Sequence, residues 1–129
     1  MNADDFKKRT KAYALRIIRL TEALPENRTS DVLGRQLLRA GTSVGANYRA
    51  ACRAKSKPDF ISKMDTVEEE CDESLYWIEL LIESGNVKTG RVSALLREGE
   101  EILRMVVASV NTARRSRQSA IRNPQSAMG

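Results

Sequence analysis

Arginines and lysines recur at helical spacing in residues 35–57, and their side chains bear the charge that binds phosphate. Positions 35, 39, 42, 46, 49 and 53 fall on one side of a helix, and two lysines extend that row. Guanidinium groups bind phosphate oxygens through paired N–H groups. The candidate nucleic-acid-binding residues of this row are Arg35, Arg39, Arg49, Arg53, Lys55 and Lys57.

A second basic group closes the chain, in residues 114–129. This stretch has four arginines, few large apolar residues and a proline, so it cannot bury enough surface to offset its ordering entropy. The composition predicts a disordered basic tail that binds polyanions by counterion release. Its candidate nucleic-acid-binding residues are Arg114, Arg115 and Arg117. Four basic residues near the start are candidates to add to this surface: Lys7, Lys8, Arg9 and Lys11.

The charge is segregated along the chain, whose net charge is +5. Residues 59–84 carry one base and nine acids. An alternative interpretation therefore pairs the arginines of residues 35–53 with carboxylates of this acidic segment. The candidate partners are Glu68, Glu69, Asp72 and Glu73.

Catalytic and metal chemistry are disfavoured by the residue types. The chain has no histidine, the commonest general base and metal ligand, and carboxylate-bridged metal bundles use Glu-x-x-His pairs. Cys52 and Cys71 are far apart and lie within helical patterns. We expect no enzyme activity, no catalytic residue, no metal and no cofactor. A nucleotide-binding loop at "GTSVG" is also disfavoured, because no strand precedes it and no lysine follows its second glycine.

Apolar periodicity predicts four helices that carry these residues. The expected ranges are about 5–24, 30–54 with Ser30 as N-cap, 58–83, and 89–113. Long helices joined by short links pack antiparallel to their neighbours. The sequence therefore predicts an all-α, antiparallel up-and-down four-helix bundle over residues 1–113, a single domain followed by the basic tail.

Small residues interrupt the second predicted helix. Gly41 and Gly45 lie four residues apart on one face of the helix. The small side chain of Ser43 nearby also allows a neighbouring helix to approach closely. Asn47 is a polar member of the core stripe, so it needs a partner, for which Glu70, Glu73 or a backbone carbonyl are candidates. We interpret these four residues as helix or subunit packing positions, with Asn47 more suited to setting register than to binding a ligand.

The stretch "LLRAGTSVGANYRAACRAKSKPDFISKMDTVEEECDESLYWIELL" resembles a bacterial four-helix-bundle family. This family is named for proteins encoded in intervening sequences of large-subunit ribosomal RNA genes. The resemblance implies a homopentamer, related to the accessory variability proteins of retroelements, with a reverse transcriptase or other nucleic-acid enzyme as candidate partner. The chain departs from the family pattern at Ala50, Ala51 and Glu73.

Two functional hypotheses follow. The first is a non-enzymatic, oligomeric nucleic-acid-binding or accessory scaffold protein that contacts structured RNA or DNA. The alternative is a structural protein–protein interaction module. The start "MNADDFKKRT" has no apolar segment behind it, and "LYWIELLI" is short and contains Glu79. We therefore expect a cytoplasmic protein without a membrane partner.

Overall fold

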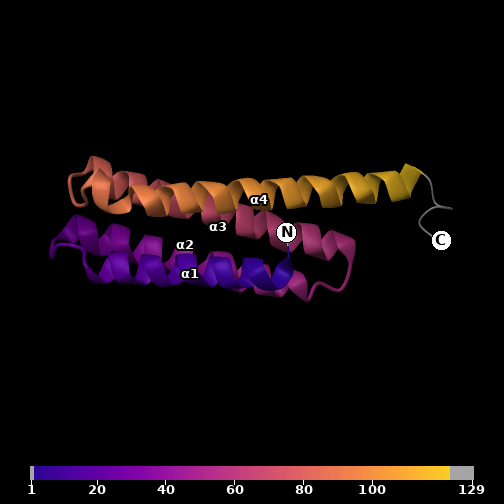
Figure 1. The fold of residues 1–129 in the computed structure, drawn as a ribbon, viewed down its shortest axis with the longest axis horizontal. Helices are drawn as coiled ribbons and strands as arrows, with labels where there is room; N and C mark the ends of the chain where they lie inside the picture. The colour runs from indigo at the N-terminus through magenta and orange to yellow at the C-terminus, as the bar shows by residue number, and fades with distance from the viewer. Residues whose placement is uncertain (1, 123–129) are drawn as a thin grey trace.

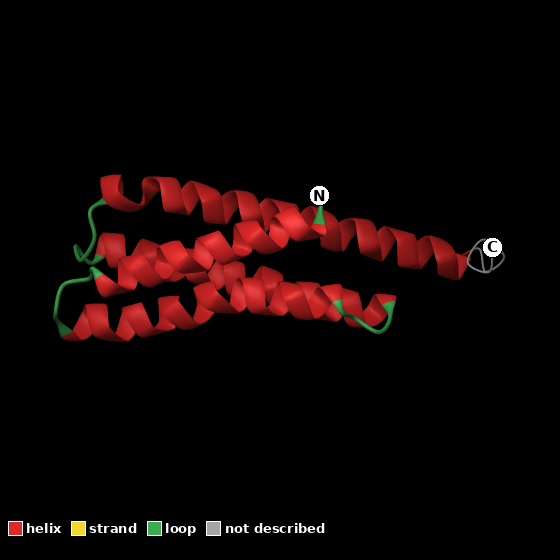
Figure 2. Cartoon of the chain, turned by 60° about the horizontal axis from the view of Figure 1, so that its bottom comes forward, coloured by secondary structure: helices red, strands yellow, loops and turns green. Residues whose placement is uncertain are grey.

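Four helices joined by short turns form the protein (Figure 1) in a computed structural model that describes residues 2–122. They are α1 (Ala3–Glu22), α2 (Arg28–Cys52), α3 (Lys57–Glu83) and α4 (Thr89–Arg122). Each helix packs against the next one in the chain and runs antiparallel to it (Figure 2). The predicted all-α up-and-down four-helix bundle is confirmed. No helix in this described part has the length and apolar character that spanning a membrane requires.

Side-chain caps fix where three of the helices begin. The side chains of Asn2, Asn27 and Ser56 accept hydrogen bonds from backbone N–H groups in the first turns of α1, α2 and α3. The prediction of Ser30 as the cap of α2 is wrong. Its backbone N–H instead donates to Asn27 Oδ1 over 2.8 Å, because the asparagine three residues earlier takes the capping position.

The core contains apolar side chains from all four helices, spaced by three or four residues along each. Burying one such side chain contributes about 1.5–3 kcal/mol. Among the most deeply buried are Phe6, Tyr13, Ile17, Leu37, Val44, Met64, Val67, Ile78, Leu81, Ile102 and Val106.

The glycines of α2 face α1 within the same chain. A Cβ at Gly41 would collide with Ile17, and a Cβ at Gly45 would stand 3.1 Å from the Thr10 hydroxyl oxygen. The Ser43 hydroxyl donates to the carbonyl of Arg39 over 2.6 Å, and the Asn47 amide donates to the carbonyl of Ser43 over 2.9 Å. The asparagine is thus satisfied within its own helix, and the two glycines allow close packing between α1 and α2.

The last helix does not end where the sequence predicted. α4 continues to Arg122 and extends past the start of α1 (Figure 1), so the expected disorder from 114 onward is wrong for 114–122. Residues of this stretch such as arginine, glutamine and alanine favour helix. Arg114 pairs with Asp65 of α3 at 2.7 Å, and the Lys57 ammonium donates to the Ser116 hydroxyl over 2.8 Å. Residues 123–129 of the predicted tail lie outside the described residues.

Candidate nucleic-acid interface

An open groove of about 490 Å³ runs along the outer surface where α1 meets α2. Its lining includes the small residues Ala14, Gly45 and Ala46, which keep the surface low between the helices. Four basic side chains also line it, three from α1 and one from α2. They are Lys7, Lys8, Lys11 and Arg49.

Helix geometry and close packing bring these four cations together. Lys7 and Lys11 are one turn apart on α1, and Arg49 lies one turn beyond Gly45 on α2. Because Gly45 has no side chain, α2 approaches α1 at Thr10. The antiparallel arrangement then places the first turns of α1 beside the last turns of α2.

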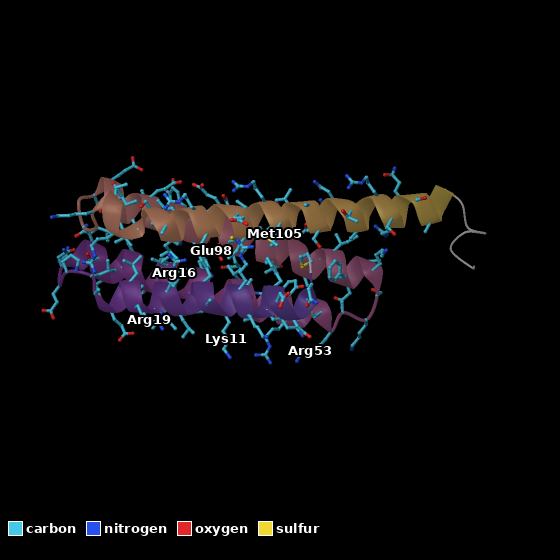
Figure 3. The ribbon with its side chains drawn as sticks, in the orientation of Figure 1. Lys11, Arg16, Arg19, Arg53, Glu98 and Met105 are labelled. Carbon is cyan, nitrogen blue, oxygen red and sulfur yellow. The ribbon has the colours of Figure 1, made fainter. Side chains whose placement is uncertain are left out.

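The charges of this α1–α2 groove are available to an external anion. Within residues 2–122, none of Lys7, Lys8, Lys11 and Arg49 forms an ion pair. Figure 3 shows Lys11 of α1 and Arg53 of α2 along the side of the bundle that faces away from α4. These side chains form a cationic edge that a phosphate backbone can approach.

The predicted basic row of α2 is divided between internal and external roles. Arg35 pairs with Asp31 on its own helix. Arg39 pairs with Glu70 at 3.1 Å and also with Glu73 of α3. The alternative interpretation is therefore right for Arg39 and its partner Glu73, whereas Glu70 was outside the expected pairing set.

The remaining predicted residues of this row lie near the α2–α3 turn. Arg49, Arg53, Lys55 and Lys57 are exposed. The backbone N–H of Lys55 donates to Asp59 over 3.1 Å, while the ammonium of Lys57 contacts the α4 extension. Arg49 lies in the α1–α2 groove, and the other three lie beyond its end.

The predicted arginines of the C-terminal segment lie on α4, not on a mobile arm. Arg114 is held by Asp65, and Arg115 donates weakly to Thr112 over 3.4 Å. Arg117 is exposed. None of the three lines the α1–α2 groove.

Arg9 differs from the lysines with which the sequence grouped it. Its guanidinium faces α4 and donates to both oxygens of Glu98, over 2.9 and 2.8 Å, and it pairs with Glu101 at 2.9 Å. The hydrogen bond from Arg9 holds the pKa of the Glu98 carboxyl below its usual value. This cluster joins α1 to α4 and leaves the three lysines facing the opposite side.

A family model described as "23S rRNA-intervening sequence protein" matches residues 4–108. The chain belongs to this family. The resemblance inferred from the sequence is thus confirmed. As a 23S rRNA-intervening sequence protein, the chain carries all four cations of the α1–α2 groove inside the matched residues, whereas Arg114, Arg115 and Arg117 lie beyond them.

A crystal structure from the S23 ribosomal protein family has the same fold as this 23S rRNA-intervening sequence protein. It comes from Bacteroides thetaiotaomicron, and its function is described as unknown. The match has a TM-score of 0.80 and 32% sequence identity, and it covers 86% of this chain and 99% of the other. Among curated proteins, none matches the chain.

Proposed function

We propose that this family member is a non-enzymatic protein that binds the phosphate backbone of structured RNA or DNA through the α1–α2 groove. The observation that carries the proposal is the cluster of Lys7, Lys8, Lys11 and Arg49 without internal ion pairs. The family's description, which refers to ribosomal RNA, and the net charge of +5 support it.

Binding of this kind depends on charge and carries little sequence information. Lysine and arginine contacts to phosphates release condensed counterions, so affinity falls as salt rises. With four contacts, the logarithm of the binding constant should fall with the logarithm of salt concentration with a slope of about −3 to −4. Phosphate contacts position a protein on nucleic acid but do not read its bases.

We further propose that the protein acts as an oligomeric scaffold. Several copies would multiply the grooves presented to one nucleic acid and raise its apparent affinity. Large apolar side chains that could contact another copy are exposed on α2 and α3: Val32, Leu38 and Tyr76. Native mass spectrometry of the full chain tests this proposal. A pentamer would agree with the family resemblance, and a monomer at every concentration would contradict the scaffold.

A protein-interaction module is the second candidate, favoured by the aromatic pair on α3. Tyr76 is 51% exposed and meets the half-buried Trp77 edge-on, with ring centroids 5.2 Å apart. The Trp77 indole N–H has no hydrogen-bond partner among residues 2–122. Exposed aromatic residues such as Tyr76 are common in protein interfaces. A reverse transcriptase or other nucleic-acid enzyme as partner, and a cytoplasmic location, stay predictions.

Fluorescence anisotropy of a labelled hairpin RNA tests the main proposal. The full chain is compared with a groove variant (Lys7→Gln, Lys11→Gln, Arg49→Gln) and an α4 variant with the same loss of charge (Arg114→Gln, Arg115→Gln, Arg117→Gln). We expect the groove variant to lose roughly ten-fold or more in affinity at low salt, with a shallower salt slope.

The α4 variant controls for net charge and should retain most of the binding. A larger loss in the α4 variant than in the groove variant would move the interface to the α4 extension. Absence of binding by the unaltered protein at low salt would contradict the nucleic-acid proposal and favour the protein-interaction module.

A further inference from the structure

A second cationic groove lies on the other side of α1, where its last turns meet the first turns of α4. It is small, about 230 Å³. Three arginines from the two helices line it: Arg16, Arg19 and Arg91. None of them forms an ion pair within the part of the chain that the structure describes.

One carboxylate, Glu98, acts on the edge of this α1–α4 groove, because the charge of Arg16 helps to lower the pKa of Glu98. Glu98 lies between α1 and α4, on the side where Arg16 also projects (Figure 3). Both of its oxygens already accept hydrogen bonds from Arg9. Arg19 and Arg91 are exposed, so their guanidinium groups can meet a phosphate from solvent.

Helix α1 is therefore a ridge with a basic groove along each flank. Residues 6–21 hold six basic residues and no acidic one, and the exposed Lys8, Lys11 and Leu15 lie along the ridge. One groove is lined by α1 residues 7–14 and the other by residues 16–23. At the helical rise, their centres are offset by roughly 13 Å along α1.

We propose that α1 lies in a groove of a double-stranded nucleic acid, with one phosphate backbone in each flanking basic groove. This inference rests on the function proposed above and names the ligand class. A helix with its side chains is about 10–12 Å across, close to the width of about 12 Å of the B-form DNA major groove. In A-form RNA the minor groove is the wide and shallow one, and α1 would lie in that groove.

The position of the two basic grooves on either side of α1 favours a double-stranded nucleic acid over a single-stranded one. A single strand that entered both grooves would have to cross the exposed side chains of α1. Two antiparallel backbones instead pass on either side of a helix placed between them. Arginines suit the α1–α4 groove, because their planar N–H groups bind a phosphate with two parallel hydrogen bonds.

Anisotropy titrations with three probes test the inference. The probes are an RNA duplex of about 16 base pairs, the DNA duplex of the same sequence, and an unpaired RNA with the same number of phosphates. The variant Arg19→Gln/Arg91→Gln removes two exposed charges from the α1–α4 groove. The control Arg97→Gln/Arg104→Gln removes two exposed charges from elsewhere on α4. Thermal unfolding by circular dichroism checks that both variants fold.

We expect a duplex to bind at least about ten-fold tighter than the unpaired RNA, and the Arg19/Arg91 variant to lose most of that difference. Its salt slope for a duplex should be shallower by about 2, from two lost phosphate contacts. Its binding of unpaired RNA should match the control. The tighter of the two duplexes identifies A-form or B-form geometry as the better fit.

Equal affinity for duplex and unpaired RNA would overturn the inference, as would an Arg19/Arg91 variant that binds duplex like the control. Either result leaves the α1–α2 groove as a site for one strand. The absence of binding by all three probes at low salt would instead overturn the proposed function itself.

Discussion

Polar side chains cross the middle of the core at one level of the bundle. The Tyr13 hydroxyl of α1 lies 2.9 Å from the Ser74 hydroxyl of α3, which donates to the carbonyl of Cys71 over 2.6 Å. The Cys71 thiol donates to the carbonyl of Gly99 on α4. Burial raises the pKa of Cys71 to about 12, so the thiol stays protonated and serves packing rather than chemistry.

Gly99→Ala tests this level of the core. A Cβ there would stand 2.7 Å from both the Tyr13 hydroxyl and a Leu75 methyl. Overpacking costs about 1–3 kcal/mol, against a helix-propensity gain of about 1 kcal/mol. Urea denaturation should show a net loss in the free energy of unfolding of up to about 2 kcal/mol.

The control for that substitution is Gly90→Ala, where the added Cβ meets nothing within 4 Å. It should leave the free energy of unfolding unchanged or raise it slightly. A Gly99→Ala protein as stable as Gly90→Ala would show that Tyr13 moves aside without cost.

The Arg9–Glu98 contact predicts a dependence of stability on pH. Its hydrogen bond lowers the folded-state pKa of Glu98 below the usual 4.5. The contribution is therefore complete above the unfolded-state pKa and is lost as pH falls through the folded-state pKa. Glu98→Gln should lower the free energy of unfolding by about 1 kcal/mol at neutral pH, and this difference should shrink in acid.

Urea denaturation over a range from neutral to about pH 3 measures this difference. Glu100→Gln, at an exposed position on the same helix, is the matched control and should show little effect at either end. A Glu98→Gln difference that persists undiminished in acid would show that the side chain acts through packing and not through its charge.

At the scale of the element, α4 is longer than the helices it packs on. It has 34 residues, against 20 in α1 and 27 in α3. Its last turns contact α3 through Arg114–Asp65 and Ser116–Lys57. These side chains hold a segment whose composition alone predicted disorder.

Asp65→Asn should loosen this extension, because it removes the charge that pairs with Arg114. Hydrogen–deuterium exchange should become several-fold faster for the amides of residues 114–120 and stay unchanged for 92–106. Asp72→Asn, an exposed change on the same helix, should alter neither region. Unchanged exchange in Asp65→Asn would indicate that helix propensity alone maintains the extension.

The helices could be predicted from the sequence because apolar residues such as Leu37, Ala40 and Val44 recur at helical spacing. Their ends were less predictable, since Asn27 and Ser30 are both good caps and only one takes the position. Near the end of α4, Arg114 pairs with Asp65, which is distant in sequence.

The candidate site was predictable only in part, because contacts between residues distant in sequence decide which basic side chains are paired. Arg49 and Arg39 are alike in the sequence pattern, but Arg39 meets Glu70 and Glu73 in the fold. Lys7 and Arg49 line one groove, although 42 positions (49 minus 7) separate them. Their proximity follows from the register between α1 and α2, and local sequence patterns do not predict that register.

At the scale of the whole molecule, the two halves of the bundle differ in charge. Helix α1 and the end of α2 expose basic residues, whereas residues 59–84 carry nine acids and one base. A polyanion is attracted to the α1 side and repelled from α3, so the charge distribution orients the protein before any contact forms.

The contact pattern of the helices also has a consequence for how the chain reaches its fold. Each helix packs chiefly on its neighbour in sequence, and α1 touches α4 only slightly. Mostly local contacts mean low contact order, which is typical of domains that fold within microseconds to milliseconds. Refolding should therefore be fast, and a slow main phase in stopped-flow refolding would contradict this expectation.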